Sequence, residues 1–494
     1  MSTTTVQEPV RTPLPETQSR NLRWIAYAVI VAVCCFHLAT LRAGHGWSGD
    51  FSLYILHARN IAEGQPYGET PFVYNERFLS HSPRSYPPVY PLLLAPVYAL
   101  YGLDYTPMKV LTYLFLPLSW LLLLRLNGIS DRSRVMLIAM SAACPIFWRF
   151  KDWVIPDFVF MALLILTMWL NQRAYSTGDD RNRPLREGLL IAVAMAAAYG
   201  TRSSGVVLPL AVAGYDIVRN RRLTAYAVTA VAGFGLLVLT MNAVAGRSEQ
   251  SYMAQFAQFS AARLAGNAIE YVRSFAHIWY TDQLKFAQYV MFGVAAIAAI
   301  AGFASRTVQW VSAVELFFAG HLAVLILWPG ASGDRYILPM IPFFLFYVMA
   351  GFERLRWKQG ATVFAGLTLT LYAMYYLKAD YGPLEDGPRQ ASFQEMTRFV
   401  EQSTEARDLH VFWNPRVLAL YTGVRSMTYG PDAAPGVNWR DFVRKGVRYL
   451  VVYLRNSDDA RVLGPIVRDH AGEVEPVWNN QDYVVYRITA GQPK

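Results

Sequence analysis

Charged residues and cysteines are both scarce in this sequence. Asp, Glu, Lys and Arg make up 16% of the 494 residues, whereas a soluble globular domain carries about one quarter. The chain has three cysteines, Cys34, Cys35 and Cys144, and each lies in an apolar segment. They form neither a disulfide framework nor the spacing of a metal site. The sequence therefore excludes the small disulfide-rich and zinc-binding classes, and its low charge argues against a soluble protein.

Long apolar runs take the place of the missing charge. Hydrophobic residues are 54% of the chain. A membrane-spanning helix needs about 20 mostly apolar residues, because the hydrocarbon core of a bilayer is about 30 Å thick. Runs of this kind include "VLTYLFLPLSWLLLLRL", "FVFMALLILTMWL", "LTAYAVTAVAGFGLLVLTM" and "VFAGLTLTLYAMYYL". They predict a mainly α-helical, polytopic membrane protein with about eleven transmembrane helices.

The net charge of +10 is concentrated in short loops between the apolar runs. Three such loops lie within Arg173 to Arg186, Arg219 to Arg222 and Arg354 to Lys358. Clusters of this kind mark cytoplasmic loops. No nucleic-acid-binding motif accompanies them, so we expect no nucleic-acid partner.

This orientation divides the chain into three parts. Residues 1–22 are polar and rich in Pro and Thr, which predicts a disordered cytoplasmic tail. Residues 23–378 form the predicted membrane domain, with large outside loops at 43–105 and 245–285. Residues 379–494 have the composition of a soluble domain, which this topology places outside the cytoplasmic (inner) membrane.

The C-terminal part alternates predicted strands and helices. The strands are "LHVFW", "RSMTY", "VRYLVVYL" and "DYVVYRI", and the helices are "SFQEMTRFVEQST", "NWRDFVRKG" and "DARVLGPIVRDHAG". This alternation predicts a small α/β domain. It carries no obvious Gly-rich phosphate loop, so we interpret it as a recognition or structural module.

A short stretch after the first apolar run, "GDFSLYILHARNIAEG", has helical periodicity. Its apolar residues recur at helical spacing, while Ser52, Arg59, Asn60 and Glu63 fall on the other face. This pattern predicts an amphipathic helix lying on the membrane surface. Asp50 stands at its start, where a carboxylate is a good N-cap. The residues alone leave open whether Asp50 caps the helix or takes part in catalysis.

Prolines and tyrosines dominate the end of the same loop, "PRSYPPVYPLLLAPVYALYG". Prolines hold the backbone in a rigid, extended path. Tyrosines such as Tyr86, Tyr90 and Tyr98 suit a membrane interface. The segment is therefore either an aromatic belt where a helix enters the membrane or a preorganised wall of a cavity.

In their order along the chain, these motifs resemble the GT-C glycosyltransferases, and within them the branch of aminoarabinose transferases and protein O-mannosyltransferases. The resemblance also includes "DWVIPDFVFMALLIL", "YGTRSSGVVLPLA", "DRYILPMIP" and the α/β tail, so it spans most of the chain. It implies a GT-C-like membrane domain and transfer of a sugar from a polyprenyl-phosphate-linked donor. The acceptor would be a lipid, glycan or protein at the outer face of the membrane.

The resemblance further implies roles for particular residues. Asp50 matches the family's first-loop acid, and a carboxylate beside the acceptor can act as general base. Tyr336 matches a phosphate-contacting tyrosine, and Asp157 is a second acid facing the cavity. The leaving group is a lipid phosphate, whose growing charge requires cationic or hydrogen-bonding partners. The predicted substrate-binding set is Asp157, Arg84, Tyr86, Arg202, Arg335, Tyr336 and Tyr54.

Plainer interpretations of these residues remain open. Arg84, Arg202 and Arg335 fall on predicted outside turns, where an arginine can also be an interfacial side chain that reaches toward water. Asp157 follows a proline and can equally be a helix N-cap.

Two departures from the family pattern concern the metal and the phosphate. Relatives often carry a second acid directly after the first, whereas here Phe51 follows Asp50. Aminoarabinose-type relatives place a lysine before the proline pair, whereas this chain has Tyr86 there. No cofactor is therefore assigned, a divalent metal (Mg or Mn) is left open, and its ligands are unknown.

Two other classes of function compete with a glycosyltransferase. A transporter or flippase of a lipid-linked glycan would carry polar residues throughout its mid-membrane segments and matched repeats. A non-catalytic membrane subunit that binds a lipid-linked glycan would tolerate loss of Asp50. The transferase is favoured because polar and aromatic residues concentrate in two outside loops.

Overall fold

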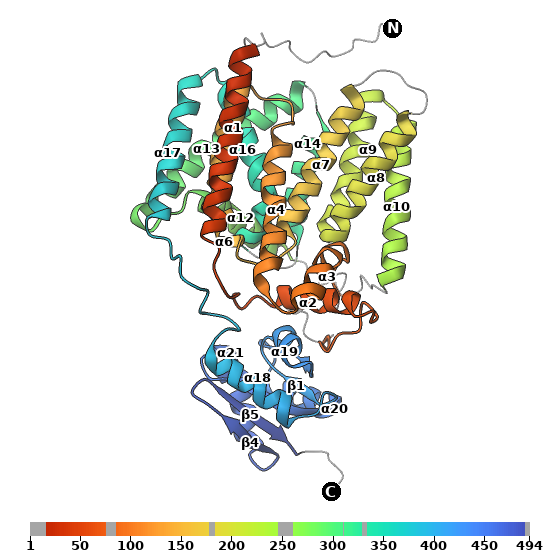
Figure 1. The fold of residues 1–494 in the computed structure, drawn as a ribbon, viewed down its shortest axis with the longest axis vertical. Coiled ribbons are helices and arrows are strands. Elements are labelled where there is room, and N and C mark those ends of the chain that lie inside the picture. Colours follow the sequence, from red (N-terminus) through yellow and green to blue (C-terminus); the bar gives the residue numbers. More distant parts are fainter. Residues whose placement is uncertain are drawn as a thin grey trace.

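A computed structural model describes residues 16–75, 85–176, 183–245, 260–309, 311–328 and 333–489. It consists of a bundle of helices and, below the bundle in Figure 1, a small domain built on a five-stranded sheet. The fold is therefore mainly α-helical with a C-terminal α/β domain, as the sequence predicts. The predicted residues 1–15 of the tail, Arg84 and residues 246–259 of the second loop lie outside the described residues.

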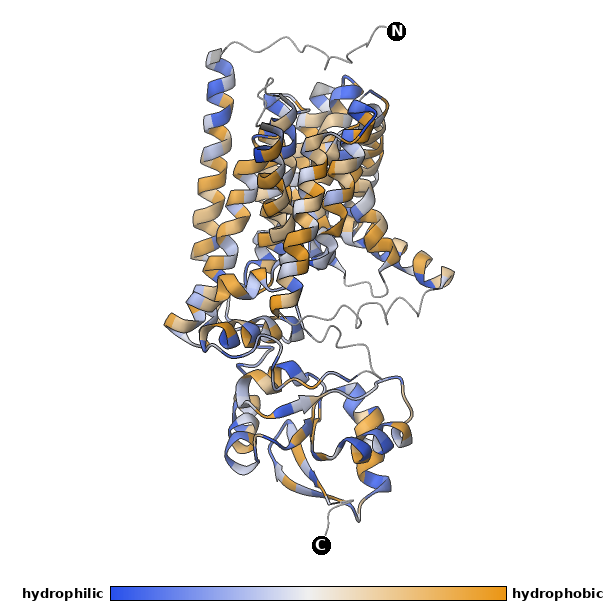
Figure 2. Ribbon diagram, turned by 90° about the vertical axis from the view of Figure 1, so that its right-hand side faces the viewer, coloured by the Kyte–Doolittle hydropathy of each residue, from blue (hydrophilic) through white to orange (hydrophobic). Residues whose placement is uncertain are grey.

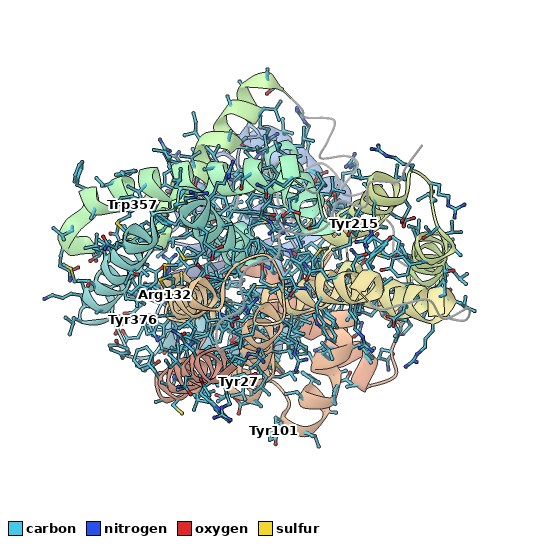
Figure 3. All side chains as sticks on the ribbon, turned by 90° about the horizontal axis from the view of Figure 1, so that it is seen from above. Tyr27, Tyr101, Arg132, Tyr215, Trp357 and Tyr376 are labelled. Atoms are coloured by element: carbon cyan, nitrogen blue, oxygen red, sulfur yellow. The ribbon has the colours of Figure 1, made fainter. Side chains whose placement is uncertain are left out.

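The membrane domain is built of helices of very different lengths. Its α-helices are α1 (Glu16–Ala39), α2 (Gly49–Ala62), α3 (Val89–Tyr101), α4 (Tyr105–Leu123), α5 (Asp131–Ala142), α6 (Pro145–Phe150), α7 (Asp157–Ser176), α8 (Arg183–Thr201), α9 (Val207–Asn220), α10 (Ala225–Ala245), α12 (Ala261–Ala276), α13 (Lys285–Gln309), α14 (Ala313–Leu327), α15 (Asp334–Ile337), α16 (Ile341–Arg354) and α17 (Lys358–Tyr376). Short 3₁₀ turns are η2 (Ser203–Val206), η3 (His277–Trp279), η4 (Asp282–Leu284) and η5 (Leu338–Met340). Seen from above in Figure 3, Arg132 of α5 and Tyr215 of α9 mark different sides of the bundle.

Among the described helical segments, six are long and apolar enough to cross a membrane. They are Thr17–Ala39, Tyr105–Leu123, Asp157–Tyr175, Ala225–Ala245, Asp282–Gln309 and Asp334–Arg354. Helices α3 and α14 are shorter but also apolar. Apolar residues dominate the bundle in Figure 2, whereas polar and apolar residues alternate in the C-terminal domain. The chain is a polytopic membrane protein, although the predicted count of about eleven spans is not confirmed.

Helix α16 lies at the centre of the bundle and is buried all round from Ile341 to Phe352. Its Gly351 allows the backbone of α13 to touch it, because a Cβ there would lie 1.8 Å from the carbonyl oxygen of Ala298. Small residues permit such close packing between membrane helices. Since α15 and η5 lead directly into α16, this tightly packed centre also fixes the position of residues 334–337.

Helix α2 corrects the prediction of an amphipathic surface helix. It packs between α3 and the C-terminal domain, and Ser52 and Asn60 on its supposed polar face are buried. Both polar side chains find partners within the protein: the Ser52 hydroxyl donates to the Gly49 carbonyl at 2.7 Å, and the Asn60 amide donates to the Glu69 carbonyl at 2.7 Å. Tertiary packing on both sides, which periodicity cannot reveal, makes α2 an internal helix.

The C-terminal domain contains a mixed sheet in the order β2-β1-β3-β5-β4. Its elements are α18 (Ala391–Ser403), β1 (Leu409–Val411), α19 (Pro415–Thr422), β2 (Arg425–Met427), α20 (Pro435–Lys445), β3 (Val447–Tyr453), α21 (Ser457–Asp469), β4 (Val474–Asn479) and β5 (Tyr483–Ile488). Strand β1 is parallel to both β2 and β3, whereas β5 is antiparallel to β3 and β4. The four strands and three helices expected from the sequence are present; α19 and β4 were not expected.

The C-terminal domain is joined to the membrane domain by more than the chain connection. Phe72 pairs with Ser426 of β2, and the Val73 amide donates to the Ser426 carbonyl at 2.8 Å. The Asn414 amide donates to the Trp47 carbonyl at 3.0 Å. These contacts place α19 directly against the first turn of α2, where Asp50 lies.

Candidate active site

Asp50 occupies the first turn of α2, but it does not cap the helix. The N-cap position is Ser48, and the Asp50 carboxylate is instead the centre of a cluster of donors. Arg335 donates from Nη1 to Oδ2, while Arg416 donates from Nη1 to Oδ1 at 3.2 Å. The Tyr86 hydroxyl also donates to Oδ1, at 2.5 Å. The capping interpretation of Asp50 is therefore wrong, because its carboxylate turns toward cations from other elements.

These donors control the protonation of Asp50. Burial by itself would raise the pKa of the carboxyl group, but the guanidinium groups of Arg335 and Arg416 and the hydrogen bond from Tyr86 outweigh it. The pKa of Asp50 therefore lies well below its usual range, and the group is a carboxylate at neutral pH. Its side chain remains 31% exposed, so a reactant can approach it.

Asp157 is the second acid of the cluster, and it is fully buried at the first residue of α7. Arg202, which follows α8, donates from Nη1 to its Oδ1. Arg335 donates from Nε to its Oδ2 at 3.1 Å. Arg335 thus bridges the two acids, using one nitrogen for each. A bridging guanidinium suits this task because its nitrogens are spread over a rigid, planar fork.

Tyrosine rings line the cluster on both sides. Tyr54 of α2 stacks on Tyr86 with the ring centroids 4.2 Å apart, and Tyr90 of α3 meets Tyr54 edge-on at 5.1 Å. On the far side, the Arg202 guanidinium lies over the ring of Tyr336 at 4.9 Å. The structure therefore brings together every predicted site residue that it describes. Arg84 lies outside the described residues.

Arg416 belongs to this cluster and was not predicted from the sequence. It comes from α19 of the C-terminal domain, where its side chain is 3% exposed. Besides Asp50, it donates to the Tyr86 hydroxyl at 3.0 Å and lies over the rings of Phe72 and Tyr86. In the sequence this arginine stands between a proline and an apolar run, "PRVLAL", which gives no indication of a partner in the membrane domain.

The cluster as a whole carries an excess of positive charge. Asp50 and Asp157 supply two negative charges, against three from Arg202, Arg335 and Arg416. The residue before Arg335, Asp334, pairs in turn with Arg149 and His277, whose side chains are both 42% exposed. Such an arrangement can bind an anion beside a carboxylate, since buried guanidinium groups are strong partners for phosphate.

A pocket of about 650 Å³ lies next to the cluster. It opens between the end of α2, the segment 65–74 and Arg425 of β2. Its lining is mostly polar and includes Arg59, Glu63 and Glu69. Phe72 lines the pocket and also packs beneath Arg416, so it joins the pocket to the charged cluster.

The described side chains do not fit a divalent metal at this site. Among the described residues, no group of three His, Cys, Asp or Glu side chains is placed to hold an ion. The space between Asp50 and Asp157, where a shared cation would sit, contains the Arg335 guanidinium. A metal would have to displace that arginine, so we assign no step to one.

Comparison with solved structures identifies the architecture. No protein-family model and no curated protein sequence matches the chain. ArnT from Cupriavidus metallidurans bound to undecaprenyl phosphate is similar, with a TM-score of 0.56 and 13% identity over 95% of this chain and 99% of that one. The oligosaccharyltransferase AglB from Archaeoglobus fulgidus, in complex with an inhibitory peptide and a dolichol-phosphate, has a TM-score of 0.55 and 10% identity over 95% and 75%.

Two further structures agree with these. A complex of the Archaeoglobus fulgidus oligosaccharyltransferase with zinc and sulfate has a TM-score of 0.56 and 11% identity over 91% and 71% of the two chains. The arabinofuranosyltransferase AftD from Mycobacteria has a TM-score of 0.54 and 14% identity over 97% and 42%. All are GT-C glycosyltransferases. The chain has the GT-C fold over nearly its whole length.

Proposed function

We propose that this protein is a glycosyltransferase that moves a sugar from a polyprenyl-phosphate-linked donor to an acceptor hydroxyl. The observation that carries the proposal is the charged cluster in which Arg335 bridges Asp50 and Asp157. It offers a carboxylate and an excess of guanidinium groups at the place where the bundle meets the C-terminal domain. The shared fold with lipid-phosphate-bound glycosyltransferases supports the same assignment.

The donor phosphate is the proposed partner of Arg202 and Arg335. In the cluster these two arginines bind carboxylate oxygens, and a phosphate offers the same acceptors with greater charge. Tyr336, beneath Arg202, adds a hydroxyl on the same side. The polyprenyl chain would remain in the bilayer beside the apolar helices. Arginines placed in this way stabilise the charge that grows on the phosphate as it leaves.

The acceptor hydroxyl is proposed to lose its proton to Asp50. The acceptor oxygen forms a bond to the anomeric carbon of the sugar, and the bond from that carbon to the phosphate oxygen breaks. The electron pair of the broken bond stays on the lipid phosphate, and the acceptor proton passes to the Asp50 carboxylate. Tyr54 and Tyr86 flank this path as a rigid aromatic wall.

The low pKa of Asp50 makes the carboxylate a weak base while Arg335 is bound to it. A donor phosphate that draws Arg335 toward itself removes one cation from Asp50. The pKa of Asp50 then rises, and the group becomes a better proton acceptor only when a donor is in place. The arrangement therefore links donor binding to activation of the base.

The acceptor and the orientation complete the proposal. The polar pocket beside Phe72 suits a lipid, glycan or protein acceptor that carries hydroxyl groups. The basic loops at the other end of the bundle favour a cytoplasmic N-terminus. The site would then face the outside of the cytoplasmic membrane.

The decisive experiment compares the wild-type protein with Asp50→Asn in reconstituted membranes that hold a labelled polyprenyl-phosphate-sugar pool. We expect wild type to transfer label and Asp50→Asn to lose at least about 10²-fold, the usual worth of a positioned acid or base. Asp432→Asn, the same change at an exposed site, is the matched control and keeps full activity.

The two other classes of function predict different results. A flippase moves the intact donor across the bilayer without transferring its sugar. A non-catalytic binding subunit binds the donor without transferring its sugar, and its donor binding is unchanged in Asp50→Asn. Normal transfer by Asp50→Asn would show that the base is assigned wrongly, and absence of transfer by wild type would remove the enzyme proposal itself.

A further inference from the structure

We propose that the C-terminal domain forms part of the active site, because Arg416 of α19 positions the Asp50 carboxylate for proton transfer. This inference rests on the proposed function and adds a residue and a domain to it. Sequence patterns alone assign no residue of this domain to the chemistry.

The first support is how closely α19 approaches α2. A Cβ on Gly49 would lie 3.1 Å from Oδ1 of Asn414 and 3.9 Å from Cδ of Arg416. A larger residue at this position would press on the Asn414 side chain. Asn414 in turn binds the Trp47 carbonyl, so the start of α19 is attached directly before the helix that carries Asp50.

The second support is the environment of the Arg416 side chain. It is almost fully buried, and its guanidinium lies 4.9 Å from the ring centroid of Phe72 and 5.3 Å from that of Tyr86. A buried charge is costly unless it is paired and hydrogen-bonded. If this position served only to hold the two domains together, an apolar side chain of similar volume would stabilise the contact as well or better. The charge at this position therefore points to a role beyond docking.

The third support is that the two oxygens of Asp50 have different partners. Oδ1 accepts from Arg416 and Tyr86, whereas Oδ2 accepts from Arg335. Arg335 also reaches Asp157, on the side where Arg202 and Tyr336 lie, and it is the arginine that a donor phosphate would recruit.

When Arg335 turns to the phosphate, Arg416 and Tyr86 still hold Oδ1. Oδ2 is then the oxygen left to receive the acceptor proton. Arg416 thus fixes the orientation of the carboxylate during the step and keeps it ionised beforehand, without touching the phosphate.

Arg416→Gln and Arg416→Lys in the full-length, membrane-reconstituted protein test the inference. We expect Arg416→Gln to lower kcat by about 10²-fold, the cost of a misplaced reacting group. The KM for the polyprenyl-phosphate sugar should change less than about threefold, because Arg202 and Arg335 hold the phosphate in this proposal. Arg416→Lys keeps the charge and restores part of kcat. Arg461→Gln, at an exposed arginine of the same domain, is the matched control.

The pH profile gives a readout that a purely structural role would not change. The groups facing Asp50 are Arg335, Arg416 and Tyr86, with Asp157 and Arg202 behind Arg335. Loss of the Arg416 cation raises the pKa of Asp50, so the acidic limb of the kcat/KM profile moves to higher pH in Arg416→Gln. In Arg416→Lys it stays near its wild-type position.

A double-mutant cycle with Asp50→Asn, followed by thermal unfolding in detergent, needs no enzyme activity. Non-additive shifts of the unfolding midpoint show that the two side chains interact across the domains. Additive shifts, or an Arg416→Gln variant with wild-type kcat and pH profile, would overturn the inference. If wild type transfers no sugar but the cycle is non-additive, the proposed function fails and the catalytic role of Arg416 falls with it, while the contact itself stands.

Discussion

Arg335 offers the sharpest prediction, because its two acidic partners use different nitrogens of one side chain. Nη1 reaches Asp50, and Nε reaches Asp157 at 3.1 Å. In Arg335→Lys the charge is kept, but a single ammonium group replaces a fork that spans both carboxylates. The variant therefore tests whether the shape of the guanidinium matters, rather than its charge.

The size of the effect follows from the hydrogen bonds that a lysine cannot make. With a donor bound, the Arg335 fork is proposed to hold Asp157 and the donor phosphate together. A single ammonium group can keep one of these two partners, so at least one charge-assisted hydrogen bond disappears from the transition state, worth about 1.5–3 kcal/mol. Since about 1.4 kcal/mol is tenfold in rate, we expect kcat for sugar transfer to fall about 10- to 150-fold. Asp157 stays bound by Arg202, so the protein still folds.

The assay is single-turnover transfer from a labelled polyprenyl-phosphate sugar, with folding checked by the thermal unfolding midpoint in detergent. Arg273→Lys, on the exposed face of α12, is the matched control and should behave as wild type. An Arg335→Lys variant that transfers within about threefold of wild type would refute the idea that a bridging guanidinium is required.

Two further predictions concern the contact between domains and the C-terminal domain itself. We expect Gly49→Ala to lower the rate of sugar transfer about tenfold or more. Its Cβ would press on Asn414 and shift α19 away from α2, and a small misplacement of reacting groups is costly. The measurement is the transfer rate of variants that fold as well as wild type. We expect Asp459→Asn to flatten the fall of the unfolding midpoint between about pH 4 and pH 7. Burial raises the pKa of Asp459 to about 7, so the stability this group contributes is present at low pH and is lost as pH rises through that value.

Each of these has a matched control elsewhere in the chain. Gly472→Ala adds a methyl group where nothing lies within 4 Å, so its transfer rate should equal that of wild type. Asp469→Asn removes an exposed carboxyl group from the same helix as Asp459 and should leave the pH dependence intact. Equal effects of Gly49→Ala and its control, or an unchanged pH slope in Asp459→Asn, would contradict the respective reasoning.

Much of the architecture could be predicted because it depends on local patterns. Apolar runs and alternating strands indicated the membrane bundle and most of the C-terminal sheet. Strand β4 was missed because Pro476 interrupts its pattern, as is common in an edge strand. Helix α19 was missed because eight residues are too few to establish a period.

The site was predictable only in part, for a related physical reason. Four site residues stand at helix ends that lie at the same end of the bundle: Asp50, Asp157, Arg202 and Arg335. The predicted topology alone therefore placed them at the same depth. Their pairing partners depend on packing between distant segments. Arg416 reaches the cluster only because the C-terminal domain folds back on α2, and no pattern within its own neighbourhood encodes that contact.

The pairing of Phe72 with Ser426 has a consequence for how the protein is made. Strand β2 is one of the two edge strands of its sheet, and an unpaired strand edge is a template for aggregation. Here a segment made early in synthesis covers that edge, and β2 itself is made near the end. The β2 edge is therefore covered only when the segment that follows α2 lies beside it. A chain whose helix bundle has failed to form would expose the β2 edge. Correct folding of the membrane domain therefore protects the C-terminal domain from aggregation through this edge.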